Sequence, residues 1–294
     1  MIPKEVIRKL RRIQITTTRK VTDVFAGQYQ SVFKGVGMEF DEVREYNPGD
    51  EIRSIDWNVT ARMGHPFVKK FVEERELTIM FLLDVSMSCR FGTRGRTKND
   101  LAAEICSVLA FSATKNNDKV GMLTFTDRVE KFIPPRKGVK HVMRVVREAL
   151  YNAPLGRGTD INGVLEYLDR VTKRRTITFV ISDFIAPDFK KTLAVTNKRH
   201  DVIALAIQDP AEVVLPKAGI VRLHDAEMAY QYEVDTSNPR IRRDYEKHTA
   251  EFISRRDKLF RSINVDSVVF RTDSSYMEPL MRFFRMREKR LIRR

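Results

Sequence analysis

The sequence predicts an α/β protein with a doubly wound, mostly parallel sheet and helices on both faces. Short, continuous apolar runs alternate along the chain with longer amphipathic segments. Such runs are typical of strands that are buried on both faces, as strands of a parallel sheet are. An N-terminal extension and a hairpin and helix insertion interrupt the alternation.

The core is predicted over residues 78–209, and residues 264–294 complete it with a last strand and helix. Strands are expected at 78–84, 119–125, 176–182, 202–208 and 265–270. Helices are expected at 97–115, 138–151, 160–172, 187–199 and 275–290. Each crossover between parallel strands is expected to be right-handed.

Residues 210–263 form the predicted insertion. Two short apolar runs, 220–223 and 229–234, flank the polar residues 224–227, a pattern that predicts a hairpin. A long, highly charged helix is expected to follow over 239–263.

Residues 1–77 are predicted to be a family-specific region that packs on the core. A basic helix is expected over 4–20. Seven acidic residues between positions 39 and 56 surround Arg44 and Arg53, which favours internal ion pairs over a partner surface. Trp57 is expected to anchor this segment to the core.

Composition limits the class of protein. Of 294 residues, 42% are hydrophobic, which favours a globular chain. No apolar run reaches about 18 residues and the start lacks a signal-peptide core, so we expect a cytoplasmic protein. Cys89 and Cys106 are too few for a disulfide framework and are expected to be small buried residues. The formal charge of +15 favours acidic partners, but it is spread along the chain.

Oxygen-bearing side chains follow three predicted strands or open the next helix. Asp84 ends the strand 78–84, and Ser86 and Ser88 follow it; Thr159 lies before the helix at 160, and Asp183 follows another strand. Carboxyl ends of parallel strands share one edge of a sheet, where ligands of such folds bind. Two carboxylates and three hydroxyls form an incomplete octahedral set suited to Mg²⁺, with Mn²⁺ or Ca²⁺ as alternatives. The competing interpretation is that Asp84 and the serines only cap a helix or hold a turn.

This arrangement resembles the metal-ion-dependent adhesion site of von Willebrand factor A domains. The string D-x-S-x-S after a buried strand, a threonine in a G-x-G-T-D loop and a later strand-end aspartate carry the resemblance. It implies direct ligation by the two serines and the threonine, and ligation by the aspartates often through water. Phe184 departs from the pattern, because many A domains have glycine there.

A narrower resemblance covers nearly the whole chain from about residue 25. The strings REYNPGDEIRSIDWNVTAR, FVKKFVEEREL and LPKAGIVRLHDAE are similar to those of the bacterial DUF58 family. Members of that family are commonly encoded beside MoxR-type AAA+ ATPases. The resemblance therefore implies a protein partner, such an ATPase or its client, and leaves open an association with membrane proteins through partners.

Three functions compete at this stage. A metal-dependent protein-interaction module agrees best with the motifs. An enzyme is disfavoured because the chain lacks the catalytic motifs G-x-x-x-x-G-K-[ST], G-x-S-x-G and H-E-x-x-H. A Mg²⁺-dependent hydrolase of the haloacid type would also need an aspartate where Ser86 stands. A nucleic-acid binder rests on charge alone, without interleaved aromatic residues.

Overall fold

The computed structural model describes residues 29, 32, 39–72, 76–151, 153–224 and 230–292. The chain divides into two compact units, residues 33–77 and the remainder. The predicted N-terminal region ends at the same residue as the smaller unit but begins earlier. Its packing on the core stays a prediction, and the helix expected over 4–20 lies outside the described residues.

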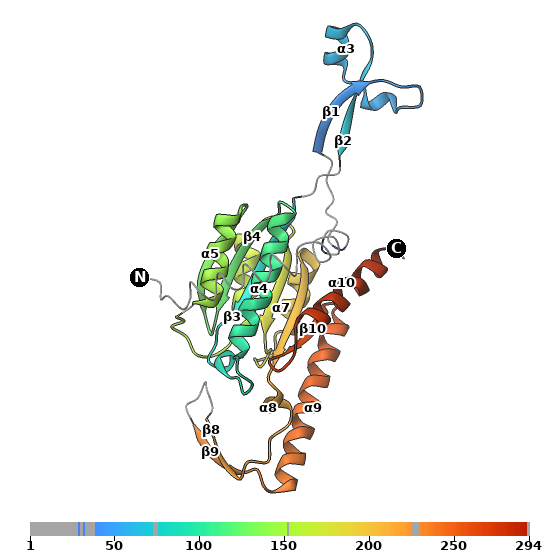
Figure 1. Cartoon of the computed structure of the whole chain (residues 1–294). Coiled ribbons are helices and arrows are strands. Elements are labelled where there is room, and N and C mark those ends of the chain that lie inside the picture. Colours follow the sequence, from blue (N-terminus) through green and yellow to red (C-terminus); the bar gives the residue numbers. More distant parts are fainter. Residues whose placement is uncertain are drawn as a thin grey trace. The chain divides into compact units, whose positions relative to one another are not determined.

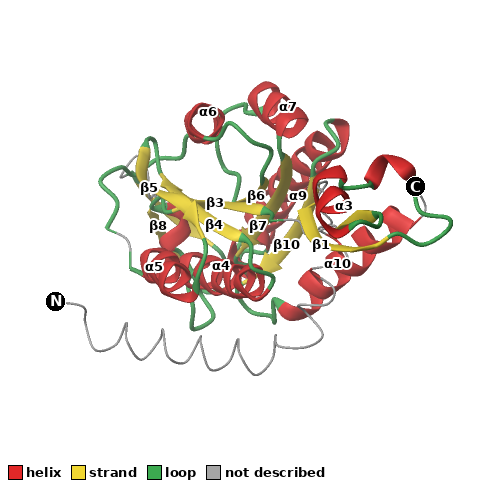
Figure 2. Cartoon of the chain, turned by 90° about the horizontal axis from the view of Figure 1, so that it is seen from above, coloured by secondary structure: helices red, strands yellow, loops and turns green. Residues whose placement is uncertain are grey.

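The larger unit is built on a six-stranded sheet, coloured yellow in Figure 2. The strand order is β10-β7-β6-β3-β4-β5, and every neighbouring pair is parallel except β4 with β5. The strands are β3 (Thr78–Asp84), β4 (Lys119–Phe125), β5 (Val129–Arg136), β6 (Ile177–Ser182), β7 (Asp201–Gln208) and β10 (Asp266–Arg271). The predicted α/β fold with a mostly parallel sheet is therefore confirmed.

Helices cover both faces of this sheet. Figure 2 shows α6 (Ile161–Val171) and α7 (Lys190–Arg199) on one face and α4 (Lys98–Lys115) and α5 (Val139–Leu150) on the other. The connections also contain the 3₁₀ turn η2 (Ser88–Arg90) and the short helix α8 (Pro210–Val213). Two long helices, α9 (Pro239–Ser262) and α10 (Met277–Ile292), lie near the C-terminus and are orange to red in Figure 1.

The long helix α9 belongs to the core as much as to the insertion. Phe260 near its C-terminal end is fully buried and joins a hydrophobic cluster that includes Leu82 of β3, Val180 of β6 and Leu165 of α6. Burying such a side chain contributes about 1.5–3 kcal/mol. The C-terminal half of α9 is thereby fixed against the same sheet face as α6 and α7.

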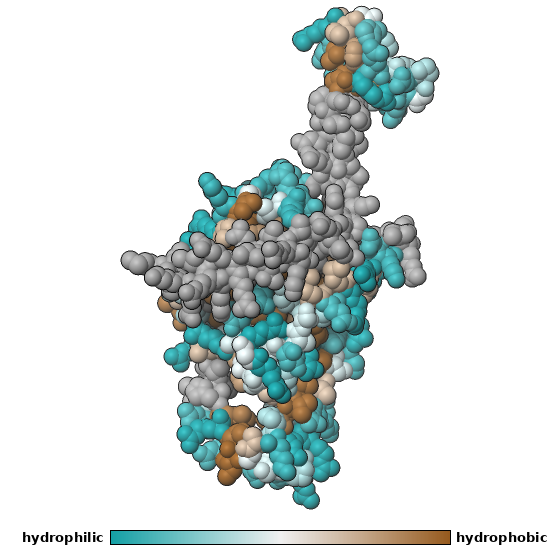
Figure 3. Space-filling view, viewed as in Figure 1, coloured by the Kyte–Doolittle hydropathy of each residue, from teal (hydrophilic) through white to brown (hydrophobic). Residues whose placement is uncertain are grey.

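The predicted hairpin is present, as β8 (Ile220–His224) and β9 (Gln231–Asp235) pair antiparallel. Its large apolar side chains are exposed, with Ile220 at 74% and Tyr232 at 57%. Figure 3 shows brown, hydrophobic atoms in the region that Figure 1 labels β8 and β9, on an otherwise largely hydrophilic face. Among the described helices, none is long and apolar enough to cross a membrane.

The smaller unit contains an antiparallel pair of strands. β1 (Glu39–Glu45) pairs with β2 (Phe67–Val72), and η1 (Ile52–Ser54) and α3 (Trp57–Met63) lie between them. Arg44 binds both carboxylate oxygens of Asp50 at 2.7 Å, and hydrogen bonds from this guanidinium and from a backbone amide lower the pKa of Asp50. This ion pair agrees with the expected internal pairing. The side chain of Trp57 is 67% exposed, and its role as an anchor to the core stays a prediction.

Candidate metal centre

The predicted ligands lie at the point where the strand order reverses. β3 is central and pairs with β4 on one side and β6 on the other. The chain passes from β3 to β4 and β5, and then crosses to β6, β7 and β10. Asp84 ends β3, and Asp183 directly follows β6. Adjacent carboxyl ends at such a switch point form the crevice in which doubly wound proteins bind ligands.

Four of the five predicted residues are connected by hydrogen bonds. The backbone N–H of Ser86 donates to Oδ1 of Asp84 at 2.9 Å. The hydroxyls of Ser86 and Ser88 lie 3.0 Å apart, and Ser88 Oγ donates to Oδ2 of Asp183 at 2.8 Å. Ser182 completes the cluster, because its Oγ donates to Oδ2 of Asp84 at 2.5 Å. Side chains that are 95 or more residues apart in sequence are thus brought into contact.

Thr159 comes from the loop next to this cluster. The backbone N–H of Met87 donates to the carbonyl of Arg157 at 3.0 Å, which holds the loop before α6 against the turn after β3. Asp160 caps α6 by accepting from the N–H of Gly163 at 3.0 Å. Thr159 is 8% exposed. The fifth predicted residue therefore lies in the loop that packs on the turn carrying the first three.

The two aspartates are close enough to affect each other. Burial and the negative charge of Asp183 raise the pKa of Asp84 to about 7, against the opposing effect of the hydrogen bonds from Ser182 and Ser86. A bound cation would remove this penalty because it favours the ionised carboxylates. Among the described residues, no three histidine, cysteine, aspartate or glutamate side chains gather as a metal cluster. The candidate centre is of a different kind, with two carboxylates and neutral hydroxyls.

A buried lysine that the sequence analysis missed also contacts the centre. Lys98 Nζ lies 2.7 Å from Oδ2 of Asp183 and also pairs with Oε1 of Glu212 in α8. Burial lowers the pKa of Lys98, but the two carboxylates outweigh it and the net shift is upward, so the ammonium stays charged. Burial raises the pKa of Glu212 despite this ammonium.

The sequence holds a signal for this lysine. Thr97 caps α4, so Lys98 is the first residue of the helix. A positive charge is unfavourable at a helix N-terminus. A lysine in that position indicates a compensating acidic partner elsewhere in the fold.

Phe184 stands where glycine is common in the motif, and packing of its ring stabilises it there. Its φ of 60° lies in the left-handed region, which costs a residue other than glycine about 1–2 kcal/mol. The ring is buried, with centroid distances of 5.9 Å to Phe189 and 5.0 Å to Phe260. This conformation lets the N–H of Phe184 donate to Ser182 Oγ at 2.9 Å and the N–H of Ile185 donate to Oδ1 of Asp183 at 3.0 Å. An aromatic cluster therefore holds this loop in its left-handed conformation.

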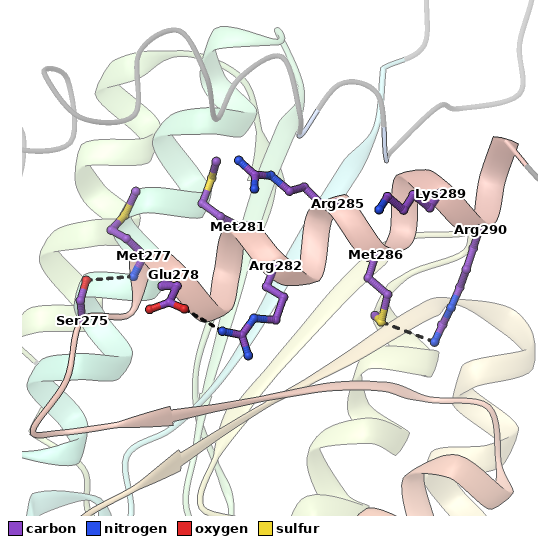
Figure 4. A pocket seen from close by; sticks show the side chains of 9 residues that line it. All are labelled: Ser275, Met277, Glu278, Met281, Arg282, Arg285, Met286, Lys289 and Arg290. Atoms are coloured by element: carbon purple, nitrogen blue, oxygen red, sulfur yellow. Dashed lines mark hydrogen bonds and ion pairs between the residues drawn. The ribbon is translucent and has the colours of Figure 1, made fainter.

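A cavity of about 920 Å³ lies elsewhere, along α10. Methionine and basic side chains line it, among them Met281, Arg282 and Arg285 (Figure 4). Arg282 is held by Glu278 at 2.7 Å. None of the predicted metal residues lines this cavity, so it is a feature separate from the centre.

Comparison with known proteins agrees with the narrower resemblance. The family profile described as "Protein of unknown function DUF58" matches residues 42–254. This chain belongs to the DUF58 family. An uncharacterized protein of Mycobacterium tuberculosis, Rv1480, is 30% identical over 285 residues, which cover 95% of this DUF58 chain and 89% of the relative. The uncharacterized protein YeaD of Bacillus subtilis is 27% identical over 108 residues, or 36% of this chain and 24% of YeaD.

Solved structures that resemble this DUF58 protein are more distant. The conserved hypothetical protein BatB from Bacteroides thetaiotaomicron is 16% identical, with a TM-score of 0.46 over 72% of this chain and 99% of BatB. Proximal thread matrix protein 1 from the mussel byssus, in a structure with a zinc-occupied MIDAS motif, is 18% identical, with a TM-score of 0.36 over 45% of this chain and 38% of that protein.

Proposed function

We propose that this DUF58 protein is a metal-dependent protein-interaction module. Asp84, Ser86, Ser88, Thr159 and Asp183 would hold Mg²⁺, with Mn²⁺ or Ca²⁺ as alternatives. The observation that carries the proposal is a set of hydrogen bonds that joins Asp84 to the backbone N–H of Ser86, the Ser86 hydroxyl to that of Ser88, and the Ser88 hydroxyl to Asp183. It assembles the D-x-S-x-S motif and the later aspartate in one buried cluster.

The charges of the cluster support a divalent cation. When all are ionised, Asp84, Asp183 and Glu212 carry three negative charges and Lys98 carries one positive charge. The sum of −2 in a buried site is costly, and one divalent ion balances it. Hard oxygen ligands also agree with Mg²⁺ better than with softer metals.

The type of ligand supports binding of a partner over catalysis. Mg²⁺ prefers six oxygen ligands, and the five proposed protein groups leave a position for a water or a carboxylate from outside. The protein groups would orient the ion and fix the direction from which that carboxylate approaches. A partner aspartate or glutamate is therefore the expected outside ligand.

The finer proposal is that the partner is a MoxR-type AAA+ ATPase or its client, and that the interaction takes place in the cytoplasm. The family resemblance supports the partner, and the expected location rests on the composition of the sequence alone. Membership of the DUF58 family agrees with it and leaves the partner to be identified by experiment.

A pull-down with the tagged, full-length chain tests the function. Native protein, Asp84→Asn and the control Glu278→Gln are compared in Mg²⁺ and in EDTA; Glu278 is an exposed carboxylate of α10. We expect the native chain and the control to retain the ATPase or its client only in Mg²⁺, and Asp84→Asn to retain neither. Retention that is equal in EDTA and unchanged in Asp84→Asn would falsify the proposal.

A further inference from the structure

A cavity of about 420 Å³ opens directly beside the candidate metal centre. Its volume lies within the range of about 300–1,000 Å³ that is typical of ligand pockets. Asp183 and Glu212 line it, and its apolar wall includes Ile185, Ile207 and Phe252. One side chain, Asp183, thus belongs to both the cavity and the proposed metal site.

The insertion supplies most of the wall. Five α9 residues line the cavity, and their spacing of three and four places them on one face of the helix: Tyr245, His248, Thr249, Phe252 and Ile253. The C-terminal part of the same helix is fixed by buried Arg256 and Phe260. A wall anchored in this way is a preformed surface, which lowers the entropic cost of binding.

The apolar wall remains partly open to solvent. Ile185, two residues after Asp183, is 48% exposed, although the neighbouring Phe184 is fully packed. Phe252 and Ile253 are only partly buried in the middle of the helix. An occupant with an apolar side chain would remove this surface from water, at about 25 cal/mol per Å².

The acidic end of the cavity restricts the occupant's charge. Without a cation, Asp183 and Glu212 would repel a carboxylate, whereas a bound divalent ion would attract it. A partner that places a carboxylate on the metal therefore has its neighbouring residues at the mouth of the cavity. Two residues of extended chain span about 7 Å, so only a side chain within two positions of that carboxylate is expected to reach the wall.

We infer that this cavity is a specificity pocket for a protein partner that presents an acidic residue with a large apolar side chain one or two positions away. The aspartate or glutamate binds the metal, and the leucine, isoleucine, methionine or phenylalanine enters the cavity formed with α9. This inference rests on the proposed function, because the metal-bound carboxylate fixes the register of the segment.

Selection from a random peptide display library on the full-length protein tests the inference. Selection is run in Mg²⁺ and again in EDTA, and Kd is then measured for selected peptides. The expected result is enrichment of an acidic residue with a large apolar residue within two positions, only in Mg²⁺. Enrichment of acidic residues in Mg²⁺ without an apolar neighbour overturns the pocket and leaves the proposed function standing. Selection that is equal in EDTA contradicts the proposed function itself.

Variants of the wall supply the matched control. Thr249→Phe fills the cavity, whereas Ala250→Phe places the same ring on an exposed position of α9 outside it. We expect Thr249→Phe to weaken peptide binding at least tenfold and Ala250→Phe to leave it unchanged, with Mg²⁺ affinity equal in both. Ile185→Ser removes exposed wall without disturbing the fold and is expected to weaken binding severalfold. Unchanged peptide binding in folded Thr249→Phe and Ile185→Ser overturns the inference.

Discussion

Replacement of Lys98 by methionine tests how the buried ammonium and the proposed metal ion would share the carboxylate of Asp183. Methionine keeps the length of the side chain but removes the charge that contacts Asp183 at 2.7 Å and also pairs with Glu212. Breaking a buried ion pair by removing one partner costs about 3–5 kcal/mol. In EDTA we therefore expect the free energy of unfolding to fall by about that amount.

Metal binding should change in the opposite direction. In the native chain, a cation at Asp183 must share its carboxylate with Lys98. Without the ammonium, only a bound metal ion can neutralise the two carboxylates. We therefore expect the Kd for Mg²⁺ to fall about tenfold or more, because each 1.4 kcal/mol of binding free energy changes Kd tenfold. At a Mg²⁺ concentration 100 times the Kd, the ion restores about 2.7 kcal/mol of the lost stability.

Urea unfolding in EDTA and in Mg²⁺, together with isothermal titration calorimetry, measures both effects. Lys131→Met is the matched control, because Lys131 pairs with Glu148 at 2.7 Å but is 46% exposed. Exposed pairs contribute about 0–1 kcal/mol, so this control should change neither quantity by much. Weaker Mg²⁺ binding in folded Lys98→Met would refute the reasoning and show that the lysine orients Asp183 for the metal.

Two further predictions concern the packing around the centre. Phe184→Ala should lower the free energy of unfolding by about 3–5 kcal/mol in urea titrations, because the aromatic cluster loses a buried ring while the left-handed backbone remains. Phe184→Gly should lose about 1–2 kcal/mol less; equal losses would argue against backbone strain at this position. Burial lowers the pKa of His200, although Asp169 beside it acts in the opposite direction. As the pH falls, His200 therefore takes up a proton at a higher pH in the unfolded chain than in the folded chain. The free energy of unfolding should then decrease as the pH drops below about 6.5, by about 1.4 kcal/mol for each pH unit that separates the pKa of His200 in the two states. His200→Asn should flatten this decline in pH-dependent thermal unfolding, and an unchanged decline would contradict the assignment.

The buried parallel strands were predictable because their sequences are apolar on both faces. β3 and β4 begin and end at the predicted residues, and β6 and β7 differ by one residue at their first position. β5 was missed. It is a partly exposed edge strand that contains Pro134 and Pro135 just before its last residue, and a strand tolerates proline only where no ladder hydrogen bond is needed.

The candidate ligands were predictable from motif spacing, but their surroundings were not. Lys98 contacts Asp183 across 85 residues, and Ser182 contacts Asp84 across 98. Such pairs depend on which strand lies beside which, and periodicity does not determine strand order. The cavity beside Asp183 could not be predicted from the sequence for the same reason, because only the fold brings α9 to the carboxyl edge of β6 and β7.

Titration of the metal-free native chain with Mg²⁺ by isothermal titration calorimetry tests the central claim most directly. Asp84→Asn and Ser88→Ala are measured beside it, with Glu278→Gln as the control. We predict saturable binding of one ion per chain in the native protein and the control, and its loss or a weakening of at least tenfold in the two site variants. No saturable binding to the native chain, or equal binding by Asp84→Asn, would contradict the metal centre.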